Sequence, residues 1–143
     1  MSTSIETSLA GAALPAATQG RSTASLDATA VSGLRELDPQ GRNGLVERVV
    51  KAFQESLARL APQLLGALQA NDVKVIRHVS HTLKSSSASI GALRLSRLCA
   101  ELEAAVRAEV TEGLEARVQA ICGEIENVKP ALEQLAQLAR PSR

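Results

Sequence analysis

Both histidines of the sequence lie in one stretch that is rich in cations and small residues, between positions 73 and 91. An imidazole nitrogen is a competent nucleophile, and a phosphorylated imidazole keeps a high transfer potential. Lys84 follows His81 by three residues, a spacing that puts both side chains on one side of a helix, where the ammonium group could neutralise a phosphoryl group. His81 is therefore the candidate phosphoacceptor, and Lys84 is the candidate cation that assists it.

The helix that must carry this pair is predicted over residues 73–90, and it turns His81 away from the core. At 100° per residue, His81 lies about 140° from the centre of the apolar stripe. This exposed side carries cations and no acid, and the small side chains of Ser85 and Ala88 would let another protein come close. The residues expected on this docking side are Lys74, Arg77, His78, Lys84, Ser85 and Ala88.

Other uses of the same residues remain open. His78 and His81 have the i, i+3 spacing of a metal pair, but residues 73–91 contain no Cys, Asp or Glu that would complete a ligand set, so no metal site is expected. One alternative is that the cations only form a solvated helix face without a binding role. Another is that His81 is an ordinary exposed histidine. The serines of this stretch are expected to pack and to hydrogen-bond the preceding turn, because no base is placed to activate them. These serines are Ser80, Ser86 and Ser87.

The composition favours one all-α domain. The 143 residues include 16 Lys and Arg and 15 Asp and Glu, and this net charge of +1 argues against a nucleic-acid partner. Hydrophobic residues make up 45%, yet only one is aromatic, a Phe, and the common residues are strong helix formers. Two cysteines form no disulfide framework, so a cytoplasmic location is the simplest expectation. No apolar run reaches the ~20 residues of a membrane span, and no membrane partner is expected.

Hydrophobic periodicity predicts one short helix and four long ones. Asp27 is a candidate N-cap for the short helix, which Asp38-Pro39 ends. Pro62 is expected to kink its helix or tighten a turn near residues 59–62, and Pro130 is expected to interrupt and bend the last helix. Spacings of three and four between apolar residues define the four long helices. These span 42–69, 73–90, 92–108 and the residues from 114 onward.

Four amphipathic helices with short connections pack most simply as an up-down-up-down bundle, and the short helix would cover one end. We expect this bundle to span residues 26–140. Residues 1–25 contain mostly Ser, Thr, Ala and Gly, and they are expected to form a flexible tail. Cys99 and Cys122 both fall on core stripes and are expected to be buried.

The run from His81 to Ala92, HTLKSSSASIGA, resembles the signature of histidine-containing phosphotransfer (HPt) domains of bacterial phosphorelays. That family reads His-x-Leu-Lys-Gly-Ser-Ser/Ala, followed by small residues and Gly-Ala. Residues 98–103, LCAELE, are similar to the next helix of the family, and the resemblance covers about residues 26–138. Ser85 departs from the pattern, because the family usually has glycine there, where a docked partner comes nearest.

The resemblance implies a four-helix bundle with a short N-terminal helix. It also implies that His81 accepts a phosphoryl group from an aspartyl phosphate on one receiver domain and passes it to another, with Lys84 assisting. The donor would be the receiver domain of a hybrid sensor histidine kinase, and the acceptor a response-regulator receiver domain. Magnesium would belong to the receiver, so the chain itself is expected to carry no cofactor. Arg77, His78, Ser85 and Ala88 would contact the receiver.

We expect a standalone monomer with no kinase or ATPase activity, because the sequence has no glycine-rich phosphate loop and no room for an ATP-binding domain. A piece of a hybrid kinase and the phosphoacceptor module of a chemotaxis-type kinase remain alternatives that share the fold. The alternative from another functional class is a helical-bundle adaptor that binds a signalling partner without chemistry.

Overall fold

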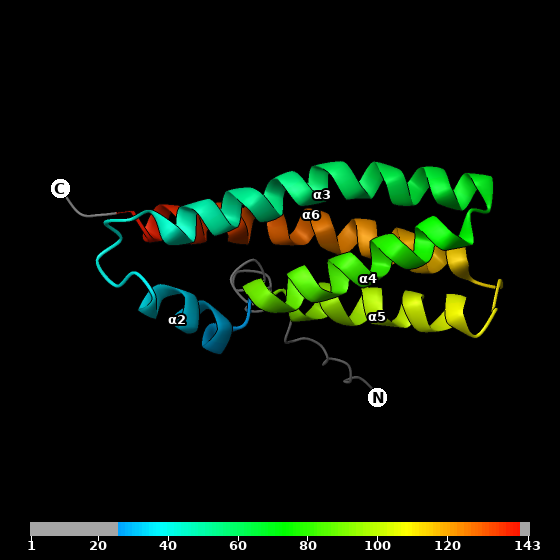
Figure 1. Ribbon diagram of the computed structural model, residues 1–143, viewed down its shortest axis with the longest axis horizontal. Coiled ribbons are helices and arrows are strands. Elements are labelled where there is room, and N and C mark those ends of the chain that lie inside the picture. Colours follow the sequence, from blue (N-terminus) through cyan, green and yellow to red (C-terminus); the bar gives the residue numbers. More distant parts are fainter. Residues whose placement is uncertain (1–25, 141–143) are drawn as a thin grey trace, which may run out of the picture.

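The structure is a computed structural model that describes residues 26–140, and this part of the chain contains helices and no strand (Figure 1). The all-α prediction is confirmed. The predicted tail, residues 1–25, lies outside the described residues. The helices are α2 (Ala28–Glu36), α3 (Leu45–Ala70), α4 (Val73–Ile90), α5 (Leu93–Arg107) and α6 (Leu114–Leu138).

The four long helices form a bundle with the predicted short helix at one end. α3 packs against α4 and α6, and α5 packs against the same two helices, so that each long helix has two neighbours. The short connections leave no room for a crossover, and successive helices are therefore antiparallel. α2 lies beyond the C-terminal end of α4, beside the first part of α3, and it contacts both (Figure 1).

The ends of the helices follow from local side-chain chemistry. The Asp27 carboxylate accepts the backbone N–H of Ala30 at 3.0 Å and caps α2 as predicted. Asn71 ends α3 in the left-handed region with φ of 56°, and Asp72 then caps α4 by accepting the N–H of Val75 at 3.3 Å. These two residues lie between the predicted helices 42–69 and 73–90.

Gly91 ends α4 and also fixes the place of α2. Its φ of 87° lies in the left-handed region that favours glycine. A β-carbon at this position would lie 3.0 Å from the backbone nitrogen of Asp27 and 3.1 Å from the Ala30 β-carbon. The Asp27 N–H donates to the Gly91 carbonyl at 2.6 Å. The turn after α4 is therefore the attachment point of α2, and a side chain there would push the two apart.

Two expectations about the last long helix were wrong. Pro130 does not interrupt α6, which continues to Leu138, and α3 likewise continues through Pro62 to Ala70. Both prolines are exposed, so water can solvate the carbonyl groups that lose a hydrogen bond. Cys99 is buried as expected, but Cys122 is only partly buried, because it follows the core residue Ile121 by one position and is rotated by about 100° from it.

The core is a single apolar cluster between the four long helices. Leu64, Leu83, Leu95, Val118 and Leu132 are fully enclosed in it. No helix between residues 26 and 140 is both long enough and apolar enough to cross a membrane.

Candidate functional site

His81 lies in the middle of α4, on the side turned away from the core. Its side chain is 60% exposed, while Ser80 and Leu83 on the opposite side of the helix are fully buried. The helix is firmly packed against α3 and α5, so the imidazole stands on a rigid support. This is the position that the helical spacing predicts for it.

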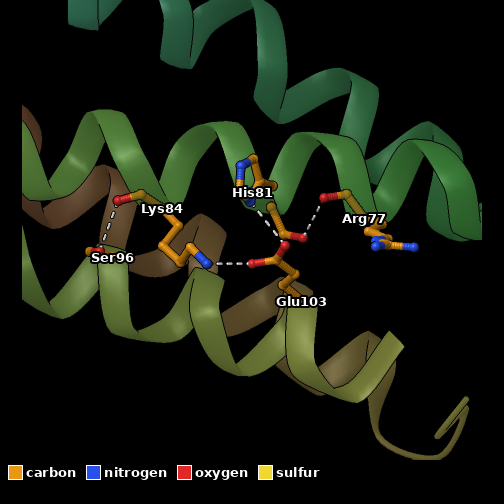
Figure 2. A network of polar contacts seen from close by, with 6 residues as sticks. Arg77, His81, Lys84, Ser96 and Glu103 are labelled. Atoms are coloured by element: carbon orange, nitrogen blue, oxygen red, sulfur yellow. Dashed lines mark hydrogen bonds and ion pairs between the residues drawn. The ribbon is translucent and has the colours of Figure 1, made fainter. Parts of the chain in front are cut away.

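Glu103 of α5 binds both His81 and Lys84 with a single carboxylate (Figure 2). Its Oε2 lies 3.0 Å from Nδ1 of His81, and its Oε1 accepts Nζ of Lys84 at 2.6 Å. The Glu103 side chain is only 8% exposed, in contrast to that of His81. Ser96, two helical turns before Glu103, donates its hydroxyl to the Lys84 backbone carbonyl at 2.8 Å. Lys84 is thus fixed to α5 at both its backbone and its side chain.

This contact corrects the expectation that the exposed side of α4 carries cations and no acid. α4 has no acid of its own there, but α5 supplies one from across the helix pair. The residues predicted as the site did not include Glu103, although it lies in the LCAELE run. Its signal in the sequence is its place four residues after Cys99 and three before Val106, on the buried stripe of the helix, where a glutamate needs partners. The identity of those partners depends on how α5 is placed along α4.

The charge of Glu103 is stabilised at this place. The hydrogen bond from Lys84 and the one from His81 lower the pKa of the Glu103 carboxyl below its usual value, although burial acts in the opposite direction. Glu103 is therefore ionised at neutral pH and can only accept hydrogen bonds.

An ionised Glu103 determines the form of the His81 ring. Since the carboxylate can only accept, Nδ1 must carry the proton that joins it to Oε2. In the neutral imidazole, Nε2 then carries an unshared electron pair. The exposed ring can present this nitrogen to a partner as a nucleophile.

The remaining predicted site residues all lie on the same side of α4. Arg77, His78, Ser85 and Ala88 are exposed, and we call them, together with His81, the docking face. Within residues 26–140, no group of three or more His, Cys, Asp or Glu side chains is placed to hold a metal ion.

Two of the three serines behave as expected. The hydroxyl of Ser80 donates to the Arg77 carbonyl at 3.1 Å, and that of Ser86 donates to the Thr82 carbonyl at 3.1 Å. Ser87 differs, because its buried hydroxyl has no hydrogen-bond partner among the described residues. It packs as a small residue against the core.

If His81 accepts a phosphoryl group, as the sequence predicts, we expect the Lys84→Ala variant to transfer it about tenfold more slowly or worse, because the cation predicted to assist the transfer is lost. It should also lose about 1 kcal/mol of unfolding free energy, since the nearly buried Glu103 loses a partner and Lys84 itself is 35% exposed. Transfer kinetics and urea denaturation measure the two effects. Lys74→Ala is the matched control, because Lys74 is exposed on the same helix. Equal transfer rates in the two variants would contradict a role for Lys84.

A helical bundle with an exposed imidazole on one helix, a lysine one turn later and small residues beside them has the features expected of the histidine phosphotransfer domains that the sequence resembles. The family model of the Hpt domain matches residues 48–140, and the chain belongs to this family. α2 precedes the matched residues.

Comparison with solved structures gave a match over most of the chain. The structure is similar to that of histidine-containing phosphotransfer protein B (HptB) from Pseudomonas aeruginosa PAO1, with a TM-score of 0.67 and 27% sequence identity. The match covers 80% of this chain and 96% of the HptB chain. Comparison with curated proteins gave no match. Family and structure together assign the chain to histidine phosphotransfer in a phosphorelay, in which Hpt domains exchange phosphoryl groups with receiver domains.

Proposed function

We propose that His81 is the phosphoacceptor of this domain and that its Nε2 receives the phosphoryl group. The observation that carries the proposal is the contact of Glu103 with Nδ1 at 3.0 Å, which leaves Nε2 as the nucleophilic nitrogen of an exposed ring. The donor is an aspartyl phosphate on the receiver domain of a hybrid sensor histidine kinase. The acceptor of the next step is the receiver domain of a response regulator.

In the transfer step, the electron pair of Nε2 attacks phosphorus. The Nε2–P bond forms, the bond between phosphorus and the aspartate oxygen breaks, and its electron pair stays on the aspartate carboxylate. Nδ1 keeps its proton, which points at Glu103. Lys84 has three N–H donors, so it can keep its bond to Glu103 and donate another to the phosphoryl oxygens. Magnesium would be bound by the receiver and lower the charge repulsion there.

The docking face supplies the approach for the receiver. Ser85 and Ala88 are exposed and small, and they follow His81 on the same side of the helix. Arg77 precedes His81 on that side and adds positive charge that suits the acidic phosphorylation pocket of a receiver, and His78 lies beside it as a further polar contact. A helical-bundle adaptor that binds a partner without chemistry would need the small residues. It would not need the buried carboxylate that binds both His81 and Lys84.

Several further properties remain predictions. We expect a bundle over residues 26–140 that acts as a cytoplasmic monomer, carries no cofactor or metal of its own, and binds neither nucleic acid nor membranes. Its contribution to the transfer is a positioned nucleophile and a docking surface, in keeping with phosphoryl transfer as a reaction governed by positioning and electrostatics.

The direct test is incubation of the full chain with a panel of receiver domains that carry a radiolabelled aspartyl phosphate, in the presence of magnesium. We expect label to move onto this chain from at least one receiver. The label should be lost in acid and retained in base, as in phosphohistidine and unlike phosphoserine. An acid-stable label, or no transfer from any receiver of hybrid kinases or response regulators, would contradict the proposal.

A further inference from the structure

We propose that Glu103 keeps the proton on Nδ1 of His81 after Nε2 has received the phosphoryl group, and so keeps the phosphorylated chain a donor at neutral and mildly alkaline pH. This role rests on the proposed function, because it concerns the product of that transfer. Glu103 is thereby a positioning residue, which acts through the imidazole ring and does not touch the phosphoryl group.

The proton matters because it decides which group leaves. When phosphorylated His81 donates, the Nε2–P bond breaks and its electron pair returns to Nε2, while an oxygen of a receiver aspartate or of water forms the new bond to phosphorus. With water, both of its protons stay on the released phosphate. If Nδ1 is protonated, neutral imidazole leaves. If Nδ1 has lost its proton, imidazolate must leave, and as a far stronger base it is a much poorer leaving group. The rate of donation is therefore proportional to the fraction of phosphorylated chains in which Nδ1 of His81 carries a proton.

The geometry of Glu103 suits this task. Its Oε2 faces Nδ1 at 3.0 Å, on the side of the ring opposite the nitrogen that carries the phosphoryl group (Figure 2). The carboxylate is only 8% exposed, so water screens its charge poorly. Lys84 binds the other oxygen at 2.6 Å, and Ser96 fixes the backbone of Lys84 at 2.8 Å. These contacts hold the carboxylate in place when a phosphoryl dianion arrives nearby.

Other charged groups around the ring do not replace Glu103. Arg77, His78 and Lys84 flank it on α4, and Arg107 follows Glu103 by one turn on α5. All of these disfavour an additional positive charge on the ring when they are protonated. Within residues 26–140, no charged side chain of α2 or α3, the other helices in contact with α4, forms an ion pair or hydrogen bond with His81. Glu103 is thus the carboxylate that faces Nδ1.

The experiment follows the loss of phosphohistidine as a function of pH. The full chain is phosphorylated with phosphoramidate, which needs no receiver, and phosphorus NMR then measures the rate of loss from mildly acidic to alkaline pH. The rate of loss should be constant at low pH and fall at higher pH. We define the midpoint as the pH at which the rate has fallen to half of its value at low pH. In Glu103→Gln we expect this midpoint to lie lower by about one pH unit or more, because an opposite charge in contact shifts a proton equilibrium by about 1–3 units.

Two further variants make the result specific. Glu101→Gln removes the same charge from the same helix, but Glu101 pairs with Arg117 at 3.7 Å, so its midpoint should equal that of the wild type. Glu103→Asp keeps a charge on a shorter side chain, and its midpoint should lie below that of the wild type. This variant decides the matter if Glu103→Gln does not fold.

The possible failures can be told apart. If phosphorylated His81 forms and the midpoints of wild type, Glu103→Gln and Glu103→Asp coincide, the role of Glu103 is overturned while the phosphoacceptor stands. If no phosphohistidine forms at position 81, both proposals are wrong.

Discussion

The His81→Gln variant is expected to accept no phosphoryl group above background, whereas His78→Ala, which changes only a docking contact, still becomes labelled. Glutamine has the size and polarity for an exposed position, but its amide nitrogen has no available electron pair for attack on phosphorus. Its NH₂ group can still donate to Glu103, so the carboxylate keeps a partner. Labelling from a phosphorylated receiver, followed by gel separation, measures both variants.

His78 is the matched control, because it is the other histidine and lies three residues earlier on the same exposed side of α4. Circular dichroism should show unchanged helicity in both variants, since neither side chain is buried. Label that persists in His81→Gln would show that another residue is the acceptor. Loss of label in both variants would mean that the receiver needs His78 for docking.

Bulky side chains on the docking face are expected to block transfer from a receiver without preventing phosphorylation of His81 by a small donor. Ser85→Arg or Ala88→Trp should reduce transfer from a phosphorylated receiver to near background, because a large side chain overlaps the space that the receiver must occupy. Phosphoramidate, a small donor, should still phosphorylate His81 in both variants. Transfer rates from the two donors are the measurement.

The bundle should remain intact in these variants, because Ser85 and Ala88 are both exposed. Ala116→Trp is the matched control, since Ala116 is exposed on α6, which does not pack against α4. Ser85→Gly, which restores the commoner family residue, should keep transfer activity and lose about 0.5–1 kcal/mol of stability through the freer backbone. Wild-type transfer from a receiver to both bulky variants would place the receiver on another face.

The sequence was sufficient for the parts of this protein that local rules determine. The apolar spacing predicted the four long helices, and the cap at Asp27 and the breaks at Asn71 and Gly91 lie where side-chain and backbone preferences put them. The exposure of His81 follows from the same helical geometry.

What the sequence did not predict depends on contacts between helices or with water. Glu103 reaches His81 and Lys84 only because α5 packs against α4 in one particular register. No spacing within either helix specifies that register. Pro130 suggested an interruption, but an exposed helix face lets water satisfy the freed carbonyl. Ser87 was expected to bond the preceding turn, yet its buried hydroxyl has no hydrogen-bond partner within residues 26–140.

The attachment of α2 through the main chain has an evolutionary consequence. α2 has no fully buried residue, and its polar link to α4 is a bond between two backbone groups, the Asp27 N–H and the Gly91 carbonyl. Most of its side chains are therefore free to drift, provided that a few apolar residues still cover the end of the bundle. Gly91 has no such freedom, because any side chain would strain the turn and displace α2. Within the run from His81 to Ala92, Gly91 thus serves the architecture at the end of the bundle, whereas His81 and Lys84 form the candidate site.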